Sequence, residues 1–329
     1  MRSTRRRTLT PAATRTAALL AAALLAGCST AAGPAGGEPE LGPVQVDPPT
    51  AALSLPMDAY TDTEAERIRM GRVQQALVAR CMARYGFTYE GVESAEGPGA
   101  GAEDRHRYLF GLADRAYAAA HGYDKSAGEA GGSGASPRVK PPAPKLSDSA
   151  YVVMNGEQPG ARSGQAPDAM TEEEAAQLDS GLTVAGQTVP AGGCGREGYR
   201  KLYAPAKDSV DLLFTFGLAA EAHDRSKQDS RVVSVLKKWS ACMDKSGYRG
   251  IRTPYDVVDE LGLEDDRGGP KAVAAAQADV GCKREVNLVG IWAAVERAYQ
   301  ERLVQEHAET LALYEKQREA RFKLAADLA

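Results

Sequence analysis

The chain has 329 residues, which is long enough to bury a substantial hydrophobic core in one or two domains. Aromatic residues make up only 6% of it, whereas glycine contributes 34 residues and proline 18, so stretches without regular structure are expected beside the folded part. The net charge is −4 although the first 27 residues hold five arginines and no acid, and an acidic remainder disfavours nucleic acid as a partner.

The first residues predict an export signal. Arg5, Arg6 and Arg7 precede an apolar run from Ala17 to Leu25, which is too short to span a hydrocarbon core of roughly 30 Å. The run closes with Leu25-Ala26-Gly27-Cys28, and this sequence resembles the lipobox of bacterial lipoproteins. The resemblance implies a signal peptide over residues 1–27, a palmitate-type lipid on Cys28, and attachment to the outer face of the cytoplasmic membrane.

Two alternatives stay open at this end of the chain. An ordinary secretory signal with an incidental cysteine has the same layout, and the arginines also fit a weak twin-arginine motif, so the export route is undecided.

Residues 28–52 follow with Gly-Pro, Gly-Gly and Pro-Pro pairs and few large apolar side chains. They predict a flexible tether, because so little apolar surface cannot offset the entropy of ordering the backbone.

The first predicted helix carries the first cysteine after the tether. Thr61 to Glu64 has the S/T-x-x-E pattern of a helix start, and Gly86 is suited to ending the helix. Apolar residues recur between them every three or four positions and predict one buried stripe, formed by Ile68, Met70, Val73, Leu77, Cys81 and Met82. We assign Met82, and Met243 later in the chain, to the core rather than to a soft metal site.

Residues 91–192 read as an insertion between the first helical unit, which begins at residues 53–90, and its remainder after residue 193. The composition predicts a short helix within residues 104–121, disorder over about 123–149, and a second short helix opening at Thr171. Two β-like runs, Tyr151 to Met154 and Thr183 to Val189, suggest a small hairpin.

Helical period returns after the insertion. Residues 208–223 and 232–243 are two such runs, and Asp229 with Ser230 either caps the second or kinks one long helix. Thr253-Pro254 predicts a further short helix. The longest periodic segment, residues 273–324, predicts one amphipathic helix whose far end outruns the core.

An ordered pair of motifs occurs twice. Cys-Met, three residues and Gly-aromatic appear at Cys81 to Phe87 and at Cys242 to Tyr248, and G-C-x-R-E follows each at Gly193 to Glu197 and Gly281 to Glu285. The repetition indicates an internal duplication. The pattern resembles poorly characterised surface lipoproteins of high-GC Gram-positive bacteria, a similarity that implies location and architecture but no activity.

The number of cysteines and the repeat together predict the disulfides. Apart from Cys28 there are four cysteines, an even number suited to an oxidising compartment, and four cysteines allow three pairings. If each copy of the repeat closes on itself, the pairs are Cys81 with Cys194 and Cys242 with Cys282. The fold class predicted is therefore mainly α, with two related disulfide-stapled helical units and a partly disordered insertion.

The sequence carries few signs of catalysis. It lacks G-x-S-x-G, H-E-x-x-H, a phosphate loop and a dinucleotide fingerprint, and its four histidines are scattered, so no metal or cofactor is expected. The best candidates for a paired function are the repeated Arg196-Glu197 and Arg284-Glu285, with Met82, Gly86, Met243 and Gly247 completing the motifs. The alternative is that these charges form surface ion pairs worth under about 1 kcal/mol.

The function expected from these observations is a non-enzymatic interaction or accessory module of the cell envelope, with the membrane and an envelope protein as partners. A solute-binding or accessory lipoprotein of an ABC-type transporter is the second hypothesis, although its usual two-lobed form needs alternating strands and helices. A cell-wall hydrolase is the third, because a tethered enzyme reaches envelope glycans and the chain holds 44 acids.

Overall fold

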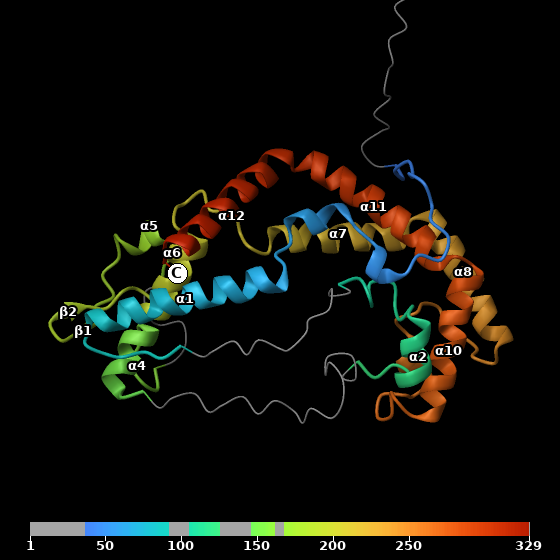
Figure 1. Ribbon diagram of the computed structural model, residues 1–329, viewed down its shortest axis with the longest axis horizontal. Helices are drawn as coiled ribbons and strands as arrows, with labels where there is room; N and C mark the ends of the chain where they lie inside the picture. The colour runs from blue at the N-terminus through green and yellow to red at the C-terminus, as the bar shows by residue number, and fades with distance from the viewer. Residues whose placement is uncertain (1–36, 92–104, 126–145, 162–167, 329) are drawn as a thin grey trace, which may run out of the picture. The chain divides into compact units, whose positions relative to one another are not determined.

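The computed structural model describes residues 37–91, 105–125, 146–161 and 168–328. From Glu38 onward the described residues belong to one compact unit that is mainly helical, which confirms the predicted fold class (Figure 1). The predicted signal peptide and the lipidation site Cys28 lie outside the described residues. None of the described helices is both long and apolar enough to cross a membrane.

The elements follow one another along the described chain with these bounds. They are two 3₁₀ turns (Thr50–Ala52 and Pro56–Tyr60), α1 (Glu64–Arg84), α2 (Arg115–His121), α4 (Asp148–Asn155), α5 (Glu172–Ala175), β1 (Thr183–Val184), β2 (Gln187–Thr188), α6 (Gly193–Tyr203), α7 (Phe214–Gln228), α8 (Ser230–Lys245), α9 (Val257–Glu260), α10 (Pro270–Glu285), α11 (Leu288–Glu306) and α12 (Ala308–Leu328).

The first disulfide unit consists of α1, α4 and α6. Helix α1 begins two residues later than the sequence pattern suggests, because the hydroxyl of Thr63 accepts from the N–H of Glu66 while the Glu66 carboxylate accepts from the N–H of Thr63. The helix ends at Gly86 as predicted, with φ of 80°. Helices α1 and α4 both pack on α6, and they enclose a core that includes Val78, Met82, Val153, Val189 and Cys194.

The predicted hairpin is wrong in its first strand. Tyr151 to Met154 lies within α4. Ser147 caps this helix, and the helix packs on α6 with Val152 and Val153 buried. The predicted disorder over about 123–149 is also wrong at its described ends, because Tyr123 is buried in a hydrophobic core and Ser147 caps α4; residues 126–145 lie outside the described residues. The second β-like run does form β1 and β2, which pair antiparallel with Thr183 opposite Thr188. Thr171 caps α5 as predicted.

The second disulfide unit consists of α2, α7, α8, α10 and α11. Asp229 ends α7 and caps α8 through the N–H of Arg231, so the two runs are separate helices. Helix α9 begins at Val257 rather than after Thr253, because the Asp256 carboxylate accepts from the N–H and hydroxyl of Thr253 and holds that stretch in a turn.

The predicted single helix over residues 273–324 is wrong. It is divided into α10, α11 and α12, with breaks at Asn287, whose φ is 53°, and at His307. Helix α12 does not outrun the core either. It packs on α1 and α6 of the first unit, where Ala325 joins a core with Met70, Val73 and Leu202 (Figure 1).

The described ends of the predicted insertion belong to different disulfide units. Phe110, Leu112, Tyr117 and Ala118 are buried in the core of the second unit, where α2 packs on α10, while α4 packs on α6 of the first unit. The described parts of residues 91–192 therefore pack in both disulfide units and not in the first alone. Each copy of the repeat closes its own disulfide. The helices that pack on the two copies, α2 and α4, both come from residues 91–192.

Residues 38–49, here called the N-terminal strap, lie along the second unit. Glu38 accepts from the N–H and hydroxyl of Ser230, and Asn287 bonds both the carbonyl of Gln45, at 2.9 Å, and the N–H of Asp47, at 2.8 Å. The predicted flexible tether is therefore wrong for residues 38–52. Composition signalled little apolar burial, but the backbone polar groups of the strap find partners at helix ends.

Candidate functional site

The two disulfides join the predicted pairs. Cys81 is bonded to Cys194 and Cys242 to Cys282, with Cα–Cα distances of 5.5 and 5.6 Å. Each bond ties a Cys-Met helix to a G-C-x-R-E helix. Met82 and Met243 are both fully buried in hydrophobic cores. The motif therefore repeats as structure as well as sequence.

The glycines of the first motif also repeat their role. Gly86 and Gly247 follow the last turn of α1 and α8 with φ of 80° and 94°. In each copy the next aromatic residue donates its N–H to the carbonyl of the repeated methionine, Phe87 to Met82 and Tyr248 to Met243. This is the left-handed helix ending that glycine adopts at least cost.

The Arg-Glu pair of the first copy is used within the fold. Glu197 is only 5% exposed and forms ion pairs with Arg84 and Lys201, so its carboxylate is held between α1 and α6. Arg196 lies 3.4 Å from a carboxylate oxygen of Asp168. Arg196, whose side chain is 38% exposed, is therefore paired at the surface, while Glu197 is buried.

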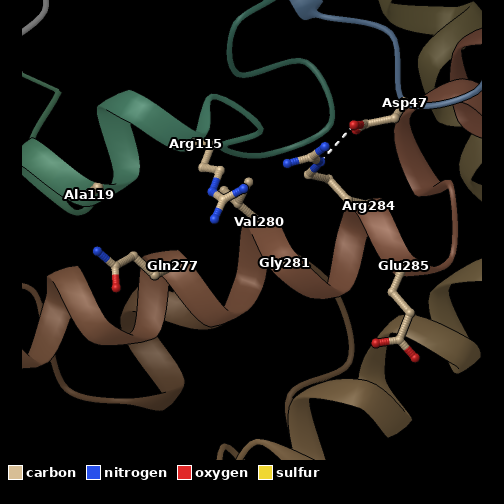
Figure 2. A pocket seen from close by; sticks show the side chains of 8 residues that line it. All are labelled: Asp47, Arg115, Ala119, Gln277, Val280, Gly281, Arg284 and Glu285. Carbon is tan, nitrogen blue, oxygen red and sulfur yellow. Dashed lines mark hydrogen bonds and ion pairs between the residues drawn. The ribbon is translucent and has the colours of Figure 1, made fainter.

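The Arg-Glu pair of the second copy lines a groove of about 590 Å³ beside α10 (Figure 2). Arg284 and Glu285 are both exposed. The Nε of Arg284 donates a hydrogen bond to the Asp47 carboxylate at 2.6 Å. The groove is built from the strap, α2 and α10, and its lining residues are Asp47, Arg115, Ala119, Gln277, Val280, Gly281, Arg284 and Glu285.

Two guanidinium groups face this groove from different helices. Figure 2 shows Arg115 reaching from α2 over α10, above Val280, while Arg284 rises from α10 towards Asp47. Glu285 points the other way, towards α8, where its Oε2 lies 3.6 Å from the Cys242 sulfur. Within the part of the chain that the structure describes, Arg115 has no hydrogen-bond or ion-pair partner, so the Arg-lined half of the groove has one acid, Asp47, for two cations.

The glycine of the G-C-x-R-E motif has opposite surroundings in the two copies. At Gly193, φ is 70° and an added Cβ would lie 2.4 Å from the carbonyl oxygen of Met154, so the close approach of α4 requires glycine. At Gly281, near the C-terminal end of α10, an added Cβ would meet no atom within 4 Å. Packing within the described chain thus explains Gly193 but leaves Gly281 with open space above it.

A buried ion pair lies under the groove and was missed by sequence reasoning. Asp279 accepts from Lys283 Nζ at 2.8 Å, from Trp239 Nε1 at 3.0 Å and from the Tyr123 hydroxyl at 3.1 Å. Lys283 also donates to the carbonyl of Leu112 at 2.6 Å. Burial raises the pKa of Asp279 and lowers that of Lys283, so the pair depends on these hydrogen bonds to stay ionised. An acid and a base four residues apart among the alanines of α10 were its only signal.

A second network surrounds His223 and runs from the fully buried Glu296 to the exposed Tyr255. Its Nδ1 lies 3.1 Å from Glu296 Oε2, its Nε2 lies 3.1 Å from the Tyr255 hydroxyl, and its ring stacks on Trp292. Glu296 also accepts from Ser226 at 2.9 Å and from Gln300 at 3.0 Å. Burial raises the pKa of Tyr255, so its phenol is a weak nucleophile near neutral pH. The network joins α7 and α11 rather than opening into the groove.

Side chains of the types that hold metal ions do not converge in the described residues. No group of three or more His, Cys, Asp or Glu side chains in the described ranges is arranged to hold a metal ion. None of the known protein-family models, curated proteins or solved structures matches the chain. The groove over α10 is therefore identified by its geometry alone.

Proposed function

We propose that this protein is an anchored, non-enzymatic binding module of the cell envelope, held by a lipid on Cys28 at the outer face of the cytoplasmic membrane. The observation that carries the binding role is the difference between the two repeats: the first is closed by α4, while the second leaves its glycine and arginine open in a groove. Two disulfides in one chain fit an oxidising, extracytoplasmic compartment.

The chemistry of the groove favours binding over hydrolysis. Its lining holds no serine, cysteine, histidine or lysine, and so no nucleophile with an adjacent base. The two lining carboxylates are the remaining candidates for acid–base work, but Asp47 is bonded to Arg284 and Glu285 points away from it (Figure 2). Arginine and amide side chains without a reacting partner are typical of recognition.

The anchor is tested by replacing its cysteine. In a bacterial host that processes lipoproteins, Cys28→Ser should move the protein from the membrane fraction to the soluble extracytoplasmic fraction, because the lipid attachment atom is lost. The wild-type chain should label with a fatty-acid analogue and the variant should not. Unchanged membrane association and labelling in the variant would rule out this anchor.

The binding role is tested by site-specific photocrosslinking in intact cells. A photoreactive residue at Gln277, which is exposed in the groove, should give a discrete adduct, while the same residue at Lys237, exposed on α8, should not. The comparison uses the full lipidated chain and so keeps the geometry of the anchored protein. An equal yield of adducts at both positions, or none at either, would count against the groove as the contact site.

A further inference from the structure

We infer that the groove over α10 binds a phosphoryl group, with Arg115 and Arg284 as its cationic ligands and Asp47 as an internal competitor. The inference rests on the proposed binding role of this groove and names the chemistry of its ligand. It also assigns a function to the strap residue that closes one end of the groove.

The charges of the groove call for an anion larger than one carboxylate. Guanidinium groups bind phosphate and carboxylate oxygens through paired N–H donors. Asp47 occupies the Nε of Arg284, at 2.6 Å, and Arg115 has no partner among the described residues. A phosphoryl group has three or four oxygens and up to two negative charges, so it can accept hydrogen bonds from more than one guanidinium group, and the exposed Gln277 amide lies along the same groove.

The floor of the groove allows close approach. Glycine inside a helix is less stable than alanine, yet Gly281 lies within α10, one turn before its last residue Glu285 and beside Arg284. An added Cβ would clash with nothing in the described chain and would instead project into free space. A bare backbone below two guanidinium groups leaves room for a tetrahedral anion.

Asp47 is held in a strained conformation at the edge of this site. Its φ is 46°, a left-handed value that is uncommon for a residue other than glycine, and the strap is fixed there by Asn287. The Asp47 carboxylate occupies an oxygen position on Arg284 that a phosphoryl group would use. Ligand binding therefore replaces the Asp47 contact and frees this end of the strap.

Two sources supply the same chemistry. One is the phosphodiester headgroup of a membrane lipid, and the other is a phosphate monoester in solution or on an envelope polymer. Glycerol 3-phosphate and the water-soluble dihexanoyl-phosphatidylglycerol represent them as probes. They are titrated separately into the purified lipidated chain in a phosphate-free sugar detergent, with calorimetric detection and ionic strength kept constant by chloride.

At least one probe should bind, and the better one identifies the source. Arg115→Gln and Arg284→Gln should each weaken its binding by about tenfold or more, since each removes charge-assisted hydrogen bonds. Arg249→Gln, at an exposed arginine outside the groove, should change nothing. Asp47→Asn should tighten binding severalfold, and Gly281→Ala should weaken it while the protein stays folded.

The inference is overturned if neither probe binds more tightly than chloride, or if the Arg115 and Arg284 variants behave like the Arg249 control. If Asp47→Asn binds the probe with unchanged or weaker affinity, Asp47 does not compete with the ligand for Arg284. These failures are separable from failure of the proposed function: an adduct at Gln277 without phosphate binding keeps the groove as a contact site, whereas loss of both rejects the groove altogether.

Discussion

The two disulfide units use one motif in two environments. In the first unit, α4 lies against the glycine of the motif, and Glu197 is buried in ion pairs. In the second, α2 packs on α10 but leaves Gly281 and Arg284 open, and an ion pair between Asp279 and Lys283 lies in the core. The positions that correspond to this pair in the first copy are Ala191 and Gly195.

The motif specifies the disulfide connection and not the site. Cysteine, methionine and the helix-ending glycine do the same work in both units. The arginine and glutamate differ, because their partners come from segments that are far away in the sequence. The strap supplies Asp47 to Arg284, whereas Arg196 meets Asp168, which lies shortly before α5.

Removing the disulfides should give the largest effects. On the chain-entropy model, bonds across sequence separations of 113 and 40 residues stabilise by about 5 and about 4 kcal/mol. Replacing Cys81 and Cys194 by alanine should therefore cost at least as much unfolding free energy as replacing Cys242 and Cys282. Urea denaturation of both double variants measures this. A larger loss in the second unit would mean that local packing, and not loop closure, dominates.

Breaking the buried ion pair should come next. Lys283→Met leaves the Asp279 carboxylate, which is fully buried, without a cation and should cost about 3–5 kcal/mol of unfolding free energy. Replacing both residues by alanine and glycine, as in the first copy, removes the isolated charge but leaves a cavity. The exposed control Lys237→Met should stay within about 0.5 kcal/mol of the wild type. A mild effect of Lys283→Met would show that the pair is dispensable.

Alanine at the two motif glycines should act in opposite directions. Gly193→Ala forces a Cβ to within 2.4 Å of the Met154 oxygen at a positive φ, and should destabilise the protein by about 2 kcal/mol or more. Gly281→Ala meets open space inside a helix and should stabilise it by about 0.5–1 kcal/mol. Thermal unfolding of the two variants provides the measurement. Equal signs would contradict the difference between the closed and open repeats.

The smallest expected effect concerns the cap of α8. Burial of Asp229 opposes ionisation of its carboxyl group. Hydrogen bonds from Arg231 outweigh this effect and lower the pKa of Asp229. The ionised cap therefore stabilises the fold above the unfolded-state pKa of about 3.9, and this contribution is lost as the pH falls through the lower folded-state pKa.

Asp229→Asn keeps an acceptor but loses the charge, so it should cost about 1 kcal/mol at neutral pH and progressively less in acid. Unfolding measured from pH 7 down to pH 3 tests this. A gap between variant and wild type that stays constant over this range would show that the charge of Asp229 contributes nothing. Helix α1, capped by the hydroxyl of Thr63, offers the comparison within the same chain.

The helical class, the ends of the Cys-Met helices and the disulfide pairing could all be predicted from the amino-acid sequence. These depend on local signals, namely apolar period, capping residues and glycine at helix ends, and on a repeat that selects one cysteine pairing. The sequence also identified Arg284 and Glu285 as candidates without knowing which would face an open site.

Only the tertiary structure decided which segments pack together and where the groove lies. The hydrophobic effect is non-directional, so an apolar helix face does not reveal which other helix it will pack on. The apolar residues of α2 therefore did not predict its packing on α10, and those of α12 did not predict its packing on α1. The strap, the break at Asn287 and the Asp279–Lys283 pair are likewise fixed by partners distant in the chain. The groove exists because those partners meet around α10 and leave Gly281 uncovered.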